Sequence, residues 1–232
     1  MTTKDEARPK RRVRIKAEYA AMLLPFIGTE FDPARLRGIH VHPHPEGGVV
    51  LVATNDRIMA VIYDGSGQAN GSWICPIPAA LSLSDTRHSI SRLHFHGNIA
   101  HATRSDLPLD ADFVDFTNPN HAGSYYAPPI DETFSRRWPE PFNDFRETGA
   151  TVTLNPDLLE PFSLAAKLRG CAFSPQITIR TQGPFAAIMV EIHNIPEFLG
   201  AIMPLNIEKP NWSRPYWFTS LCAALPSEGG SK

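Results

Sequence analysis

Residues 49–65 read VVLVATNDRIMAVIYDG. Two runs rich in Val, Ile and other apolar residues, GVVLVAT at 48–54 and IMAVIYD at 58–64, flank the pair Asn55-Asp56. Val and Ile favour strands, whereas Asn and Asp bond to nearby backbone groups and favour turns. The stretch therefore predicts two neighbouring strands, the first largely buried, joined by a short turn.

The segments on either side extend this pattern. The stretch RVRIK at 12–16 alternates, which predicts a strand with Val13 and Ile15 facing inward. Residues 17–27, AEYAAMLLPFI, favour a short helix with Pro25 near its end. Further strands are predicted at 36–42, 72–77, 92–103 (two strands joined at Gly97-Asn98) and 111–116, with a short helix from Pro78. Residues 11–117 thus predict an α+β domain, an antiparallel sheet with helices on one face.

A second, shortened domain is predicted at 149–205. ATVTLN at 150–155 predicts a strand, and Asn155-Pro156-Asp157 supplies an N-cap, a first-turn proline and an acidic first turn for a helix ending at Gly170. Three more strands are predicted, QITIRT at 176–181, FAAIMVEIH at 185–193 and EFLGAIMPL at 197–205. The remaining segments are a basic flexible arm (1–10), a proline-rich crossover (118–148) with a short helix near Asp131–Arg137, and an aromatic C-terminal tail (206–232).

Composition narrows the function classes. The net charge is −2, which argues against a wholly basic nucleic-acid-binding protein, although the first sixteen residues hold seven Lys or Arg. The cysteines Cys75, Cys171 and Cys222 form no CxxC pair, which indicates free thiols in a reducing cytoplasm. No apolar run approaches the roughly 20 residues that cross a bilayer. No phosphate-loop, dinucleotide or serine-hydrolase motif occurs, and we predict no cofactor.

A histidine-rich stretch, GIHVHPHPEGG at 38–48, raises the question of a metal site. The spacing of His40, His42 and Glu46 matches the first metal motif of a cupin, and imidazole with carboxylate suits Fe, Mn, Ni or Zn. A cupin needs a further ligand, for which His94, His96 and His101 lack a matching context. The prolines and Glu46-Gly47-Gly48 are typical of a turn. We favour a β-hairpin, with a cupin-like metal enzyme as the alternative.

The order of these elements resembles the bacterial DNA polymerase III β sliding clamp. The resemblance rests on residues 49–65, on WICPIPAAL at 73–81, on TVTLNPDLLEPFSLA at 151–165, and on Met203-Pro204-Leu205, which matches the Met-Pro-(Met/Leu) that closes the family's chain. Clamps of this family have three such domains in each chain. This sequence has room for two, and it continues beyond the Met-Pro-Leu.

The resemblance implies a non-catalytic scaffold that associates nonspecifically with duplex DNA and tethers a polymerase or another replication protein. It also implies a ring-like homo-oligomer, and the shortened form would suit a phage or prophage. Lys and Arg on the inner side would contact phosphates. The candidates are Arg12, Arg14, Lys16, Arg35, Arg37, Lys167 and Arg169. Met203, Pro204 and Leu205 would edge the groove that binds partner peptides.

One observation weakens the expectation of DNA binding. The helix predicted at 17–27 contains no Lys or Arg, so its inward face would attract phosphates poorly. A third possibility is therefore a degenerate clamp fold that serves as an interaction module without binding DNA.

Overall fold

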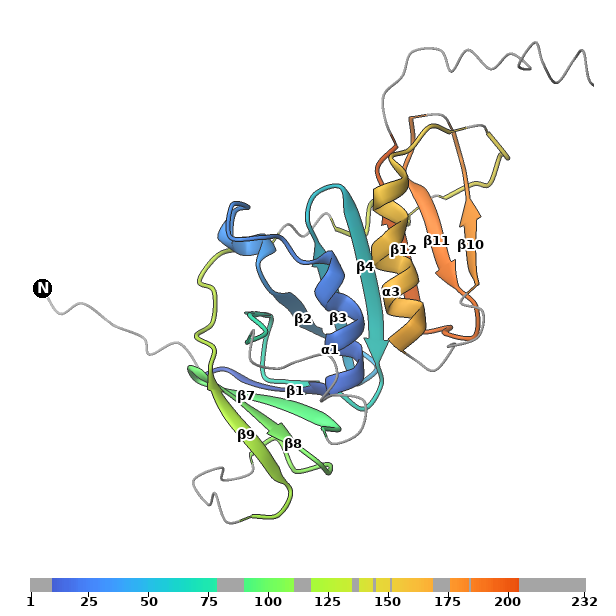
Figure 1. Cartoon of the computed structure of the whole chain (residues 1–232). Coiled ribbons are helices and arrows are strands. Elements are labelled where there is room, and N and C mark those ends of the chain that lie inside the picture. Colours follow the sequence, from blue (N-terminus) through green and yellow to red (C-terminus); the bar gives the residue numbers. More distant parts are fainter. Residues whose placement is uncertain are drawn as a thin grey trace, which may run out of the picture.

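The computed structural model of the chain describes residues 10–78, 90–110, 118–134, 138–143, 145–150, 152–168, 176–183 and 185–204. Its described strands form two antiparallel sheets (Figure 1). The first sheet has the order β5-β1-β7-β8-β9. It consists of β5 (Gln68–Ala69), β1 (Arg12–Lys16), β7 (Arg92–His96), β8 (Ile99–Thr103) and β9 (His121–Tyr126).

The predicted strand at 12–16 and the strand pair at 92–103 are confirmed. Val13 and Ile15 are fully buried, and β1 pairs along its whole length with β7. Two strands of this sheet were not predicted. β5 lies in the Gly-rich connection at 65–71, and β9 lies inside the segment expected to be a crossover. The connection to the second half of the chain therefore begins after Tyr126.

The second sheet unites the two halves of the chain. Its order is β10-β11-β12-β4-β3-β2-β6. Five of its strands were predicted from their apolar runs at positions that overlap β10 (Ile177–Arg180), β11 (Ile188–Ile192), β12 (Phe198–Ile202), β2 (Ile39–Pro43) and β6 (Trp73–Cys75). The opening stretch forms β3 (Val49–Thr54) and β4 (Ile58–Asp64), which pair directly. β4 also pairs with β12 over five residue pairs, so the sheet continues from one half of the chain into the other.

The helices gather on one face of this sheet. α1 (Ala17–Leu23) continues into a 3-10 turn, η1 (Leu24–Phe26), where Pro25 ends the regular helix. α3 (Glu160–Leu168) follows another 3-10 turn, η3 (Pro156–Leu159), and α1 and α3 lie side by side (Figure 1). A third 3-10 turn, η2 (Ala34–Leu36), precedes β2. The N-cap predicted at Asn155 is confirmed, because its side-chain Oδ1 accepts a hydrogen bond from the Asp157 N–H at 3.0 Å.

Three phenylalanine rings pack together where the two halves of the chain meet. The Phe162 ring of α3 lies 4.9 Å from the Phe26 ring of η1 and 6.1 Å from the Phe198 ring of β12, measured between centroids. Gly200 of β12 allows this packing, because a Cβ there would lie 2.3 Å from a carbon of the Phe162 ring. Aromatic contacts of this kind add to the free energy of burying the rings.

Some expectations differ from the structure or lie outside it. Val152–Asn155 form no strand, although Val152 and Leu154 pack against the core. Asp131–Phe134 are not helical. The helix after Pro78, the strand at 111–116, Cys171, Cys222, Arg169, Leu205, the tail from 206 and all but the last residue of the arm lie outside the described residues. None of the described helices is long and apolar enough to cross a membrane.

Candidate functional site: the joint pocket and the basic residues

A small pocket lies where the two halves of the second sheet meet. We call it the joint pocket; its volume is about 200 Å³. Its lining comes from the β3–β4 turn and β4 (including Arg57 and Met59), from β12 and its end (Ala201 and Met203), and from the segment after β9. This is smaller than the roughly 300–1,000 Å³ of most small-molecule sites, so it suits one or two side chains of a peptide.

The β3–β4 turn is built by the pair Asn55-Asp56. The Asn55 Oδ1 accepts hydrogen bonds from the N–H groups of Arg57 and Ile58, each at 3.1 Å. Asp56 adopts a positive φ of 68°, which Asp tolerates better than most residues. This turn presents the exposed Arg57 at the pocket.

The end of β12 lies directly beside this turn. Ala201 pairs with Met59, and the Met203 N–H donates to the Arg57 carbonyl at 2.9 Å. Met203 is half exposed and lines the pocket, whereas Pro204 directly after it is partly buried. Of the three residues predicted to edge a partner groove, the structure thus places Met203 at the pocket. Leu205 is outside the described residues.

The opposite wall was not predicted from the sequence. It consists of Phe134, Trp138 and Pro141, all from the connection between the two halves. The stretch WPEPF at 138–142 carried one signal, because its two prolines cannot donate to a strand ladder and so argue against a central strand there. Which sheet residues these rings would meet depends on the path of a long connection, which periodicity does not reveal.

The histidine-rich stretch forms the predicted hairpin. The His40 Nε2 donates to the Arg35 carbonyl at 2.8 Å, and the His42 Nδ1 lies 3.2 Å from the Ser72 Oγ. Glu46 is exposed in the turn, where its N–H donates to the His44 Nδ1. Within the part of the chain that the structure describes, no three His, Cys, Asp or Glu residues group so as to hold a metal ion. The geometry therefore lends no support to the cupin-like alternative.

Two of the three predicted DNA contacts on β1 leave the sheet opposite its buried face. Arg12 and Arg14 alternate with buried Val13 and Ile15, so their side chains leave the sheet on the face opposite the core. The Arg14 guanidinium already donates to the carbonyls of Leu107 at 2.8 Å and Ser66 at 3.1 Å. The Arg14 Nη1 also lies 3.6 Å from the Asp106 carboxylate, so its charge is already paired within the protein.

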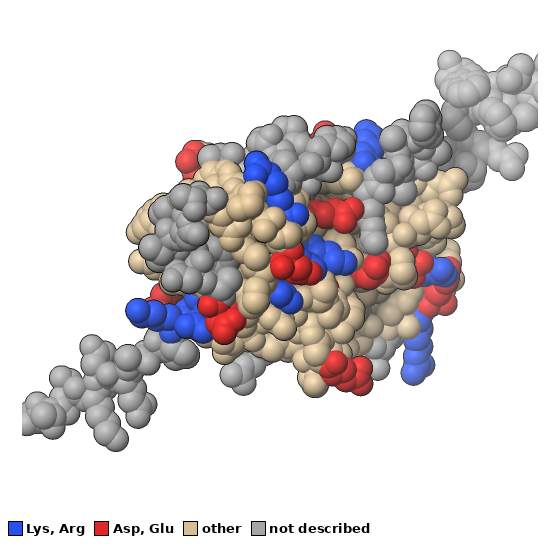
Figure 2. All heavy atoms as spheres, turned by 90° about the horizontal axis from the view of Figure 1, so that it is seen from below, with Lys and Arg blue, Asp and Glu red and all other residues tan. Residues whose placement is uncertain are grey.

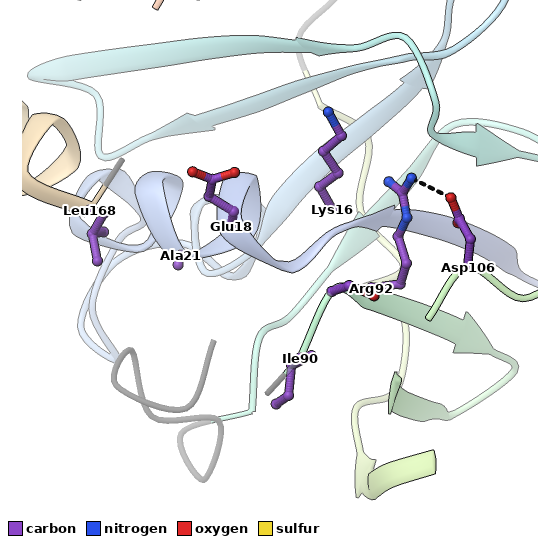
Figure 3. A pocket seen from close by; sticks show the side chains of 8 residues that line it. Lys16, Glu18, Ala21, Ile90, Arg92, Asp106 and Leu168 are labelled. Carbon is purple, nitrogen blue, oxygen red and sulfur yellow. Dashed lines mark hydrogen bonds and ion pairs between the residues drawn. The ribbon is translucent and has the colours of Figure 1, made fainter. Parts of the chain in front are cut away.

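A larger pocket of about 550 Å³ lies beside the helices (Figure 3). It is lined by Lys16 and Arg92, but also by Glu18 and Asp106. The Arg92 Nη2 donates to the Asp106 carboxylate at 2.7 Å, which lowers the pKa of Asp106. Because positive and negative groups alternate here, the pocket is not a strong anion site.

The other predicted contacts are dispersed. Arg35 and Arg37 are exposed around η2, where the Arg37 Nε donates to the Asp32 carbonyl, and Lys167 is exposed on α3. Figure 2 shows one further face of the molecule, where Lys and Arg are interspersed with Asp and Glu. The six described candidates thus belong to three places in the fold, β1, the turn η2 and the helix α3.

Comparison with known proteins bears on the fold. No protein-family model matches the sequence, and no curated protein matches it. Among solved structures, the Caulobacter crescentus pol III beta matches with a TM-score of 0.53 at 14% identity, over 89% of this chain and 69% of that chain. The chain has a sliding-clamp-like fold.

Two other solved sliding clamps match this chain to a similar extent. The DNA polymerase sliding clamp of Pseudomonas aeruginosa has a TM-score of 0.51 at 11% identity and covers 89% of this chain and 70% of its own. The sliding clamp of Bartonella birtlesii, solved bound to griselimycin, has a TM-score of 0.52 at 14% identity and covers 86% and 66%. The α+β, clamp-like fold expected from the sequence is therefore confirmed, and the chain spans about two thirds of the length of these clamps.

Proposed function

We propose that this chain is a non-catalytic, clamp-like scaffold that binds a short apolar segment of a replication partner in the joint pocket and associates nonspecifically with duplex DNA in the cytoplasm. The observation that supports it best is the joint pocket itself. The Met203-Pro204 pair of the predicted partner site lies at the pocket or directly beside it, next to the turn that carried the resemblance.

The lining of the pocket indicates what the partner offers. Met59, Ala201, Met203, Phe134 and Trp138 form an apolar surface that would bury a Leu, Met or Phe side chain. Arg57 at the same pocket would pair with a carboxylate or a backbone carbonyl of the bound segment. A short peptide with an apolar side chain beside an acceptor group fits both features.

Griselimycin is a suitable probe, because the Bartonella birtlesii clamp was solved bound to it. We expect the full chain to bind it in isothermal titration calorimetry, and Met203→Glu to weaken binding at least tenfold by placing a charge at the apolar pocket. Leu164→Glu is the matched control, because Leu164 is a similarly exposed apolar residue on α3, outside the pocket lining. Absence of binding by the natural chain, or equal binding by Met203→Glu, would contradict the proposal.

A second candidate is a clamp-fold interaction module that does not bind DNA. The balanced charges of the pocket beside the helices favour it, since Glu18 and Asp106 oppose Lys16 and Arg92 there. Retention on circular DNA compared with linearised DNA at low and high salt separates the two candidates. A closed ring stays on the circle and leaves linear DNA through its ends, whereas the interaction module is retained on neither.

A further inference from the structure

The two histidines of β2 lie on the same side of the sheet as the joint pocket. His40 and His42 alternate with the buried Ile39 and Val41, so both rings leave the sheet on the face away from the core. His40 pairs with Val52, and Val52 pairs with Val61 of β4. Met59 is two residues from Val61, so it shares that face, where it lines the pocket.

Both rings also touch the aromatic wall of that pocket. The His40 and Phe134 rings are stacked, with centroids 3.4 Å apart and an angle of 23° between the planes. The His42 and Trp138 rings are stacked at 6.2 Å and 21°. The two histidine rings lie 6.3 Å apart and nearly parallel, so they form a flat support under both aromatic residues.

We propose that His40 and His42 are positioning residues for the joint pocket: their stacked rings hold Phe134 and Trp138 in place as its wall. This inference rests on the proposed function, because it assigns the histidine-rich hairpin to the partner site. Two hydrogen bonds of the described residues also hold the segment that leads to the wall. Near it, the Glu132 carboxylate accepts from the Arg35 N–H and the Ile130 N–H donates to the Ile74 carbonyl, both before Phe134 in the chain.

The two histidines contribute differently. His40 is 2% exposed, and its Nε2 must carry a proton, because its partner is the Arg35 carbonyl, which only accepts. The His42 Nε2 is buried and has no hydrogen-bond partner among the described residues. A phenyl ring at position 42 would therefore keep the stack on Trp138 and remove an unsatisfied polar atom.

The arrangement makes the wall sensitive to acid. The groups that face the pair are the Arg35 carbonyl from η2, the Ser72 hydroxyl, the rings of Phe134 and Trp138, and each histidine itself. No carboxylate of the described residues bonds to either ring. Burial lowers the pKa of His40 from 6.5 to about 4 and also lowers the pKa of His42.

The sign follows from these directions. Burial under the wall makes both histidines harder to protonate. When the wall moves away, they become easier to protonate and take up protons. The docked wall is therefore fully favoured above pH 6.5 and loses stability as the pH falls toward 4.

The test compares His42→Ala and His42→Phe in the full chain. His44→Ala is the matched control, because His44 belongs to the same hairpin but packs edge-on against Tyr63. Hydrogen exchange of residues 130–143 at pH 7.5 reports the wall without any ligand, and griselimycin affinity at pH 7.5 and 5.5 reports the pocket. We expect faster exchange and about tenfold weaker binding for His42→Ala. His42→Phe should keep the exchange rate and the affinity of the natural chain at pH 7.5. When the pH is lowered to 5.5, it should lose less affinity than the natural chain does.

Unchanged exchange in His42→Ala, or the same increase in His44→Ala, would overturn the inference. So would His42→Phe behaving like His42→Ala, since that would mean that ring stacking is not what holds the wall. The exchange result does not depend on the ligand. If the natural chain fails to bind griselimycin, the proposed function falls, while the role of the histidines is still decided by exchange.

Discussion

At the scale of single residues, burial reverses one of the simplest readings of the sequence. Arg11 belongs to the basic N-terminal run, yet it is 1% exposed and donates through its Nη2 to the Ala127 carbonyl. Burial lowers the pKa of Arg11 and raises the pKa of the adjacent Cys75 thiol to about 12, so this thiol is a buried structural group. Alternation alone would place Arg11 on the same side as Val13, and its charge alone would place it in water.

Asp64 is the residue on which the junction of the two sheets depends most. It is fully buried at the end of β4 and accepts hydrogen bonds from the Lys16 N–H at 2.8 Å and from the N–H and hydroxyl of Ser66. Replacing it with Ala leaves three donors without this acceptor and removes one of the two carboxylates beside Arg92, whose Nη1 lies 3.7 Å from Asp64.

We expect Asp64→Ala to lower the free energy of unfolding by about 3 kcal/mol. Urea denaturation measures this, with Glu46→Ala as the control, since Glu46 is an exposed acid in a hairpin turn. A loss below about 0.5 kcal/mol, the range of ordinary surface changes, would show that the carboxylate is not structurally required.

At the scale of elements, the prediction of strands succeeded where one side of the strand is buried. β1, β3, β4, β7, β8 and β12 all carry apolar side chains at regular spacing, and each was expected. β9, with the sequence HAGSYY, has no fully buried residue, and β5 has only two residues. Short or half-exposed strands carry little periodic signal, because their pairing depends on a neighbour that is distant in the sequence.

The helix α3 offers a direct test of how the halves are joined. Phe162 is fully buried against Phe26 and Phe198, whereas Leu164 on the same helix is 42% exposed. We expect Phe162→Ala to cost about 3–5 kcal/mol of stability through the cavity it leaves. Leu164→Ala should change stability by less than about 0.5 kcal/mol. Thermal and urea unfolding of both variants measures the difference, and similar losses would mean that α3 does not pack as described.

At the scale of the whole molecule, the edges of the two sheets bear on how copies of the chain would associate. The second sheet is continuous across the two halves through β4 and β12, and the described edge strands β9 and β10 end different sheets. Unpaired edges of this kind are available to another copy of the chain. The division into two domains, and with it a six-domain ring of three chains, stays a prediction.

Light scattering of the purified chain measures this directly. We expect a mass of about three times 25.7 kDa for such a ring. The electrostatic association with DNA should weaken steeply as salt rises, because each released counterion contributes to the slope, whereas a closed ring stays on circular DNA. A monomer at all concentrations would remove encirclement and leave the interaction module as the function of the fold.

The chain itself dictates local geometry through side-chain period and turn chemistry, which act between residues close in sequence. The alternation of β1, the apolar runs of β3 and β4, the Asn55-Asp56 turn and the Asn155 cap could all be derived in this way. The joint pocket could not, because Met59, Trp138 and Met203 come together only when β12 pairs with β4 and the intervening segment packs across them. Such contacts are selected by the free energy of burying whole surfaces, a quantity that no short window of residues contains.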